Sequence, residues 1–233
     1  MAKSFKYLGF ITALFVTVLL VSNIASSKIV VLGPFTFDGG TILFPLSYIF
    51  GDILTEVYGY ARSRRVIWAG FIMLILASVV FMVIGALPSA PEWDGQQAYD
   101  KILGLTPRIV LASIIAYFAG EFSNSYILAK IKIWMKGRFL WMRTIGSTVV
   151  GEAVDTGLFV VIAFWGTMGT ELLIAIIVSN YIFKVGVEAL FTPATYAVTG
   201  FLKKREREDH YDVGTDFNPF RLEEPEEKAA ETA

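Results

Sequence analysis

Six long apolar segments constrain the fold of this chain more than any other feature. They cover residues 7–27, 41–58, 65–87, 108–130, 144–166 and 172–200. About 20 helical residues cross the hydrocarbon core of a bilayer, so each segment is long enough to span it. Because 55% of the residues are hydrophobic and only 18% are charged, a water-soluble domain is excluded. The sequence predicts an all-α, polytopic membrane protein, a bundle of about six transmembrane helices.

The basic residues predict how this bundle is oriented. One set of connections holds Lys3, Lys6, Arg62, Arg64, Arg65, Lys130, Lys132, Lys136, Arg138, Arg143, Lys203, Lys204, Arg205 and Arg207. The opposite set holds only Lys28, Lys101 and Arg108. Lys and Arg concentrate on the cytoplasmic side of membrane proteins. We therefore expect both termini in the cytoplasm.

Two connections on the opposite, outer side have recognisable patterns. Residues 29–32 and 35–37 flank Gly33-Pro34, which predicts a short extended or hairpin-like loop after the first helix. Residues 88–106 are polar, with a small amphipathic piece at 98–103. The expected domain organisation is one six-helix transmembrane domain over residues 1–200. Residues 201–233 form an acidic tail, which we expect to be disordered and cytoplasmic.

Several kinds of chemistry lack their residues in this chain. There is no cysteine, and the single histidine, His210, lies in the charged tail, so disulfides, thiolate metal sites and histidine catalysis are not expected. The motifs of P-loop ATPases, zinc metalloproteases and serine hydrolases are missing from the sequence. We predict no catalytic residues, no metal and no cofactor.

Charged residues inside the apolar segments are the main indication of function. They are Asp52, Glu56, Glu121, Glu152, Asp155, Lys184 and Glu188. A charged side chain at the bilayer centre costs about 3 kcal/mol on insertion scales. Several such residues facing lipid would cost more than a protein's typical net stability. They are therefore expected to face one another or water.

Helical spacing places these residues on one polar face of each helix. The stripes are Tyr48, Asp52 and Glu56; Glu121 and Asn124; Thr148, Glu152 and Asp155; and Asn180, Lys184 and Glu188. Four polar faces predict a central cavity. Because six carboxyl groups face one lysine, some must be protonated, or neutralised by Lys28, a cation or a substrate. The alternative is that these groups only hold the helices together.

The same residues carry a resemblance to a known family. Asn23 and Lys28, the stretch 44–48 with Asp52, the stretch 56–62, and then Glu121, Asn124, Arg143, Ser147, Asp155, Lys184 and Glu188 resemble the queuosine precursor transporter family, also called the vitamin uptake transporter family. The resemblance covers about residues 5–200. The spacing of Pro45, Tyr48, Asp52 and Glu56 with Tyr58-Gly59 is its most specific part.

This resemblance implies a multi-pass importer in the bacterial inner membrane that works by alternating access. Its substrates would be 7-cyano-7-deazaguanine, 7-aminomethyl-7-deazaguanine, or both. The implied partners are this small molecule and the lipid bilayer, with no nucleic acid, and a homo-oligomer is left open. The energy source is also left open between protons, sodium and trapping of the substrate inside the cell.

The predicted site follows from the polar stripes and the resemblance together. Substrate binding is assigned to Asn23, Tyr48, Asp52, Glu121, Asn124, Glu152, Asp155, Asn180 and Lys184, and proton coupling or gating to Lys28, Glu56 and Glu188. A carboxylate suits the N–H edge of a guanine-like base, and Tyr48, Tyr181 or Phe183 could stack on its ring. Two other functions remain open: the substrate-binding subunit of an energy-coupling factor transporter, and an intramembrane enzyme that uses paired carboxylates.

Overall fold

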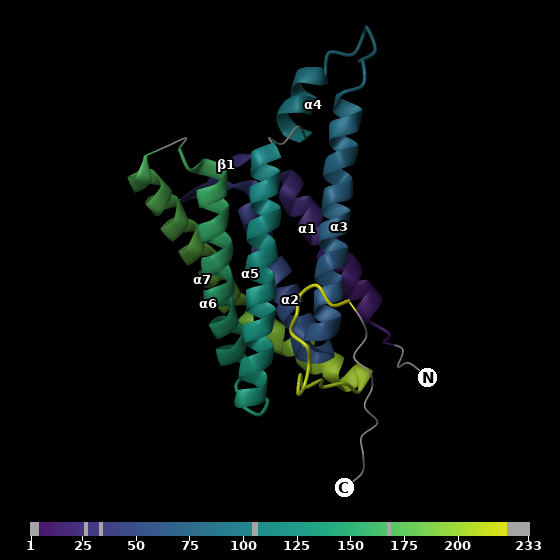
Figure 1. The fold of residues 1–233 in the computed structure, drawn as a ribbon, viewed down its shortest axis with the longest axis vertical. Helices are drawn as coiled ribbons and strands as arrows, with labels where there is room; N and C mark the ends of the chain where they lie inside the picture. Colours follow the sequence, from purple (N-terminus) through teal and green to yellow (C-terminus); the bar gives the residue numbers. More distant parts are fainter. Residues whose placement is uncertain (1–4, 26–27, 33–34, 104–106, 167–168, 223–233) are drawn as a thin grey trace.

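The computed structural model describes residues 5–25, 28–32, 35–103, 107–166 and 169–222, and these residues are mainly helical (Figure 1). The helices are α1 (Leu8–Ala25), α2 (Phe44–Tyr58), α3 (Tyr60–Gly85), α4 (Gln96–Leu103), α5 (Pro107–Trp134), α6 (Leu140–Phe164) and α7 (Thr170–Glu206), with a short 3-10 helix, η1 (Gly39–Ile42). The strands β1 (Ile29–Leu32) and β2 (Phe35–Asp38) pair antiparallel, with Ile29 opposite Asp38.

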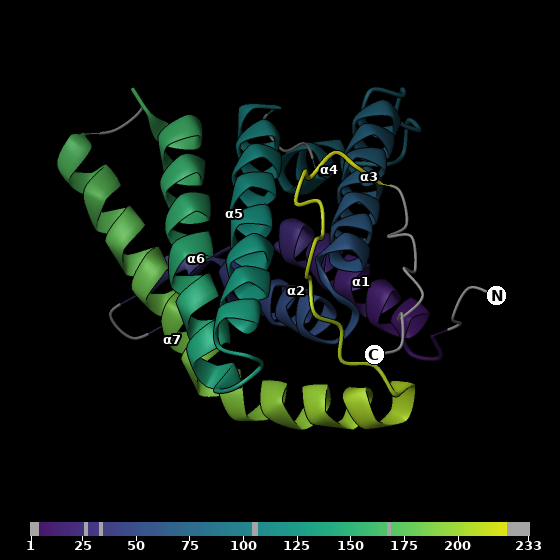
Figure 2. The ribbon, with the colours of Figure 1, turned by 60° about the horizontal axis from the view of Figure 1, so that its bottom comes forward.

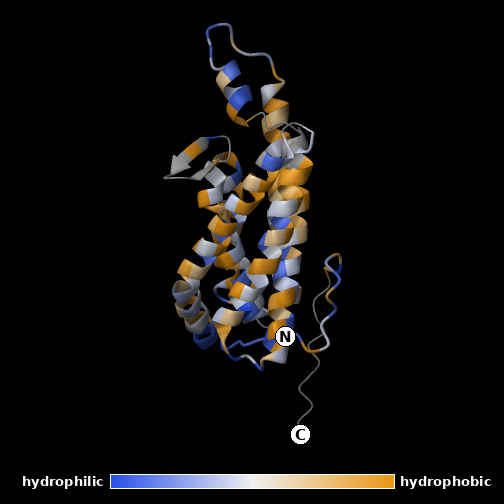
Figure 3. Cartoon of the chain, turned by 90° about the vertical axis from the view of Figure 1, so that its left-hand side faces the viewer, coloured by the Kyte–Doolittle hydropathy of each residue, from blue (hydrophilic) through white to orange (hydrophobic). Residues whose placement is uncertain are grey.

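Each of the six predicted apolar segments coincides with a long helix. Five spans are long and apolar enough to cross a membrane: Leu8–Ala25, Gly39–Tyr58, Tyr60–Gly85, Leu140–Ile162 and Leu173–Glu206. The sixth long helix, α5, has 28 residues, but Glu121 and Asn124 make its middle more polar. Orange apolar residues dominate the long helices in Figure 3. The prediction of an all-helical polytopic membrane protein is confirmed, and the hairpin expected after the first helix is present.

Helices α3, α5 and α6 run beside one another along the long axis, and α2 lies behind them (Figures 1 and 2). Helix α2 is buried along most of its length because α1, α3, α5 and α7 all pack against it. Its polar face, which contains Asp52 and Glu56, therefore lies inside the bundle. This central position brings the polar faces of the neighbouring helices toward one another.

Helix α7 bends, so that its C-terminal part crosses one end of the bundle (Figure 2). Pro193 lies inside this helix. Proline lacks the N–H group that would bond to the carbonyl four residues earlier, and its ring crowds that carbonyl, so a bend there is expected. The bend places Lys203 beneath α2, where its Nζ lies 2.6 Å from Glu56 Oε1.

Glycines allow α5 and α6 to pack with their backbones close together. A Cβ atom on Gly120 would lie 2.9 Å from the carbonyl oxygen of Gly151, and one on Gly151 would lie 2.7 Å from Asn124 Cβ. Small residues at such crossings are typical of membrane helix pairs. The close approach holds the polar residues of α5 against those of α6.

The segment after α7 differs from the disordered tail that composition predicts. Residues 207–222 lie along the bundle: the His210 N–H donates to Val57 O at 3.3 Å, and Asp212 accepts the Tyr60 N–H at 3.0 Å. The Phe217 ring packs on Tyr60 at 5.0 Å. These few anchors within an acidic stretch explain why composition was misleading here. Residues 223–233 of the predicted tail lie outside the described residues.

Gly59 separates α2 from α3 and gives a test of this arrangement. Its φ is +86°, and a Cβ there would overlap the His210 ring. Gly59→Ala should therefore lower the midpoint of thermal unfolding, since a backbone with φ +86° and ψ +162° is essentially restricted to glycine and costs about 1–3 kcal/mol with a side chain. Gly157→Ala is the matched control, because a Cβ at this helical position meets nothing within 4 Å. Intrinsic fluorescence of the purified protein reports both midpoints, and equal midpoints would contradict the assigned backbone.

Candidate functional site

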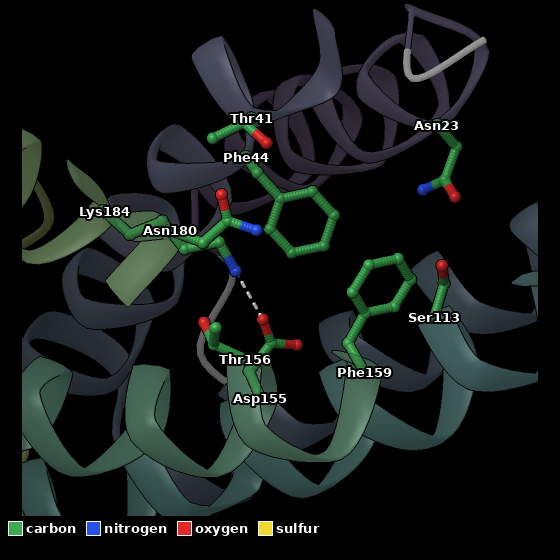
Figure 4. A pocket seen from close by; sticks show the side chains of 9 residues that line it. All are labelled: Asn23, Thr41, Phe44, Ser113, Asp155, Thr156, Phe159, Asn180 and Lys184. Carbon is green, nitrogen blue, oxygen red and sulfur yellow. Dashed lines mark hydrogen bonds and ion pairs between the residues drawn. The ribbon is translucent and has the colours of Figure 1, made fainter. Parts of the chain in front are cut away.

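A polar hollow opens between the helices near the end of α1 and the start of α5 (Figure 4). It has an empty volume of about 480 Å³, counting the open solvent at its mouth. The lining residues come from α1, η1, α2, α5, α6 and α7: Asn23, Thr41, Phe44, Ser113, Asp155, Thr156, Phe159, Asn180 and Lys184. Ligand pockets commonly form between the helices of a bundle.

An ion triad forms the charged wall of the hollow. Lys184 Nζ on α7 lies 2.6 Å from Asp155 Oδ2 and 3.0 Å from Glu152 Oε2, both on α6 (Figure 4 draws the Asp155 contact). Glu152 and Asp155 are three residues apart, so they share one helix face. All three groups are buried. The ammonium group compensates two carboxylates that the membrane interior would otherwise exclude.

Two aromatic rings face the same hollow. Phe44 and Phe159 point into it from α2 and α6 in Figure 4. Lys184 Nζ also lies 5.0 Å from the Phe44 ring centroid, within the range of a cation–π contact. Asn23 and Asn180 add amide groups to the lining. The hollow therefore combines flat apolar surfaces with a few polar groups, as sites for planar ligands do.

A second polar group lies outside this lining, where α2 packs on α5. Asn124 Nδ2 donates to Asp52 Oδ1 at 2.7 Å, and Thr55 Oγ1 donates to Ser125 Oγ at 3.1 Å. Glu121 occupies the space left by the missing side chain of Gly51. Tyr48, Asp52, Glu121 and Asn124 are all fully buried. These predicted substrate residues are not among those that line the hollow, although Tyr48 and Glu121 are electrostatic neighbours of Asp155.

A third group joins the cytoplasmic ends of the helices, as the predicted orientation defines them. Glu56 on α2 forms an ion pair with Arg143 of α6, and its Oε1 lies 2.6 Å from Lys203 Nζ and 3.5 Å from Lys132 Nζ. Asp209, beyond α7, joins the same network at 2.7 Å from Lys132 Nζ and 2.9 Å from Lys203 Nζ. We call Glu56, Lys132, Arg143, Lys203 and Asp209 the inner ion network.

The charges of the inner ion network favour the ionised form of Asp209. Partial burial acts to raise the pKa of the Asp209 carboxyl. Hydrogen bonds from Lys132 and Lys203, together with their positive charges, outweigh burial and hold this pKa below its usual value. Asp209 is therefore a stable anion that ties α5 to α7.

The structure separates the predicted site residues into these groups. Asn23, Asp155, Asn180 and Lys184 line the hollow, and Glu152 supports it through Lys184. Glu188 is buried and has Asp52 and Glu152 as electrostatic neighbours. Lys28 lies elsewhere, exposed at the start of the hairpin, where its carbonyl accepts the Gly39 N–H.

Some residues of the site were missed by the sequence reasoning. Phe159 lies four residues after Asp155, so the helical stripe could have included it. Lys132 and Lys203 were counted only as determinants of orientation because they lie near the ends of the predicted spans, and Arg143 entered the family resemblance without a role in the site. Of the residues predicted to stack, Phe183 packs on Phe37 at 4.8 Å and Tyr181 donates to Val149 O at 3.2 Å.

The fold and the hollow together define a class: a polytopic helical membrane protein with a polar pocket enclosed between its spans. Among the described residues, no three His, Cys, Asp or Glu side chains are grouped as a metal site requires. The family described as "Putative vitamin uptake transporter" matches residues 38–198. The chain belongs to this family.

Curated relatives agree with that membership. A Bacillus subtilis (strain 168) protein named "Probable queuosine precursor transporter" is 30% identical over 204 residues, 87% of this chain and 86% of that protein. The Escherichia coli (strain K12) "Queuosine precursor transporter" is 28% identical over 162 residues, 68% of this chain and 71% of that protein. These names describe transporters and not enzymes, so the alternative hypothesis of an intramembrane enzyme is rejected. No solved structure matches the chain significantly.

The ion triad predicts a specific pattern of stabilities. Lys184→Met leaves Glu152 and Asp155 buried without their cation, so it should lower the free energy of unfolding by about 3–5 kcal/mol. Adding Asp155→Asn removes one uncompensated charge and should restore part of this loss. Lys204→Met, at an exposed position of the same helix, is the control. Denaturation gives the free energy of unfolding of the wild-type protein, Lys184→Met, the double variant and Lys204→Met. A double variant that is less stable than Lys184→Met alone would refute the pairing.

Proposed function

We propose that this protein imports queuosine precursors, 7-cyano-7-deazaguanine and/or 7-aminomethyl-7-deazaguanine, across the bacterial inner membrane by alternating access. The observation that carries the proposal is the hollow in which the Asp155–Lys184 pair lies beside Phe44 and Phe159. The names of the curated relatives supply the substrate class. The substrate-binding group comprises Asn23, Asp155, Asn180 and Lys184, with Phe44 and Phe159 as stacking residues.

The chemistry of the hollow suits a guanine-like bicyclic base. Such a base presents adjacent N–H donors, which one carboxylate can accept in bidentate geometry, and Asp155 is that carboxylate. Its ring carbonyl accepts from Lys184 Nζ or from the amides of Asn23 and Asn180. Phe44 and Phe159 would stack on its flat faces. The fully buried Tyr48, Asp52, Glu121 and Asn124 support the site without touching the substrate.

Alternating access needs a closed side opposite the open one, and the inner ion network supplies it. With both termini in the cytoplasm, the hollow opens outward and the Glu56 network lies on the inner side. Lys132, Arg143 and Lys203 come from three different helices, so their contacts to Glu56 hold the inner ends of α2, α5, α6 and α7 together. The described conformation then corresponds to an outward-facing state. Inward opening requires these ion pairs to separate.

Uptake by the purified chain in liposomes tests this function. Radiolabelled 7-cyano-7-deazaguanine should enter saturably, and unlabelled 7-aminomethyl-7-deazaguanine should compete if both are substrates. Asp155→Asn should lower uptake at subsaturating substrate at least about tenfold, since a hydrogen bond to a charged group contributes about 1.5–3 kcal/mol. Glu171→Gln, which neutralises an exposed acid on α7, should leave uptake unchanged.

The outcome also separates the transporter from an energy-coupling factor subunit. Uptake by this chain alone supports a complete transporter. Uptake that appears only after separate ATPase subunits are added would contradict the proposal. Unimpaired uptake by Asp155→Asn would show that the substrate binds elsewhere.

A further inference from the structure

Three carboxyl groups near the hollow form no ion pair with any cation of the described residues. Lys184 is fully engaged with Glu152 and Asp155, and the three cations nearest Glu56 belong to the inner ion network. Within the described part of the chain, no ion pair reaches Asp52, Glu121 or Glu188, and these side chains are at most 1% exposed. A charged carboxylate with neither water nor a cation is strongly disfavoured in such surroundings.

The hydrogen bonds available to Asp52 and Glu188 are also incomplete. Asn124 donates to Asp52 Oδ1, but no donor in the described segments reaches Asp52 Oδ2 or either oxygen of Glu188. The two carboxyl groups lie close enough to interact directly. Two carboxylates cannot donate to each other, so a contact between them is favourable only when at least one carries a proton. Asn124 Oδ1, also buried and without a donor, adds an unfilled acceptor beside Asp52.

The surroundings connect this pair to the hollow. Glu188 lies four residues after Lys184 on α7, so both project from the same helix face. Glu152, which contacts Lys184, is an electrostatic neighbour of both Glu188 and Glu121. The ionisable groups that act directly on the pair are Glu56 from α2, Glu121 from α5 and Glu152 from α6. Lys184 from α7 reaches it through Glu152, and Tyr48 and Tyr117 are neighbours of Glu121 and Glu152.

We propose that Asp52 and Glu188 form a proton-binding site, separate from the substrate hollow, through which a proton gradient drives import. The proposal rests on the function proposed above. One proton enters from the outer side with each substrate, binds to one carboxylate of the Asp52–Glu188 pair between α2 and α7, lowers the negative charge of the pair by one, and leaves to the cytoplasm when the inner ion network opens. Substrate on Asp155 changes the partners of Lys184, and hence the charge that Glu152 presents to Glu188.

Proton movement in the wild-type protein gives the first test. Liposomes with an alkaline interior and a trapped pH-sensitive dye should acidify when 7-cyano-7-deazaguanine is added outside. At equal proton and substrate stoichiometry, accumulation should rise about tenfold for each unit of pH difference. Accumulation that follows a sodium gradient and ignores pH would overturn the proposal, as would substrate entry without any acidification. This test uses the wild-type protein, so its result does not depend on whether a variant folds.

Glu188→Gln gives the second test, because it replaces the titrating group by a neutral one of the same shape. Accumulation driven by a pH gradient should be lost, while exchange of labelled for unlabelled substrate across the membrane should remain. Glu171→Gln, the exposed acid on the same helix, should keep both activities. Asp52→Asn, on α2, should have the same two effects as Glu188→Gln. Gradient-driven accumulation by both Glu188→Gln and Asp52→Asn at the wild-type level would refute the site.

The two proposals fail in distinguishable ways. If wild-type protein exchanges substrate but never accumulates it along a pH gradient, proton coupling is wrong and the import function stands. If wild-type protein neither exchanges nor accumulates these deazaguanines, the proposed function itself is wrong.

Discussion

The arrangement of this protein depends on one constraint, which is that charged groups in the membrane interior must be neutralised inside the bundle. The chain meets it in two opposite ways. At the hollow, one cation, Lys184, serves two carboxylates. In the inner ion network, one carboxylate, Glu56, is surrounded by three cations. The first leaves a net negative charge, which we propose binds the N–H donors of the substrate, and the second holds the helices together.

Both arrangements require close packing around α2. Gly51 leaves room for Glu121, and Gly120 and Gly151 allow α5 and α6 to approach along their backbones. The bend of α7 then lets a single helix contribute at two depths: Lys184 and Glu188 beside the hollow, and Lys203 in the inner ion network. A movement of α7 would therefore displace residues of both the hollow and the inner ion network. For the alternating access that we propose, this shared helix is the physical route from substrate occupancy to the opening of the inner side.

The sequence predicted the helices well because hydrophobic length is a local property. It also predicted which acids lie inside, since the cost of exposing them to lipid does not depend on the details of the fold. It could not predict that Asp155 lines the hollow and Asp52 does not, because both lie on polar stripes. Only the packing of α2 on α5 pairs Asp52 with Asn124. Lys132 and Lys203 were missed because their partner, Glu56, is distant in sequence. The tail was misjudged because Asp212 and Phe217 act through tertiary contacts.

We propose that buried polar residues from several helices surround one hydrated, outward-open hollow that holds the substrate. The chain has no cysteine, so a single Ser113→Cys variant allows this to be measured directly with a membrane-impermeant maleimide in intact cells. We expect the maleimide to label Ser113→Cys from the outside and 7-cyano-7-deazaguanine to protect this cysteine from labelling. Ser89→Cys, in an exposed loop, should be labelled without protection. A Ser113→Cys variant that never reacts, or that reacts equally with and without the substrate, would contradict this proposal.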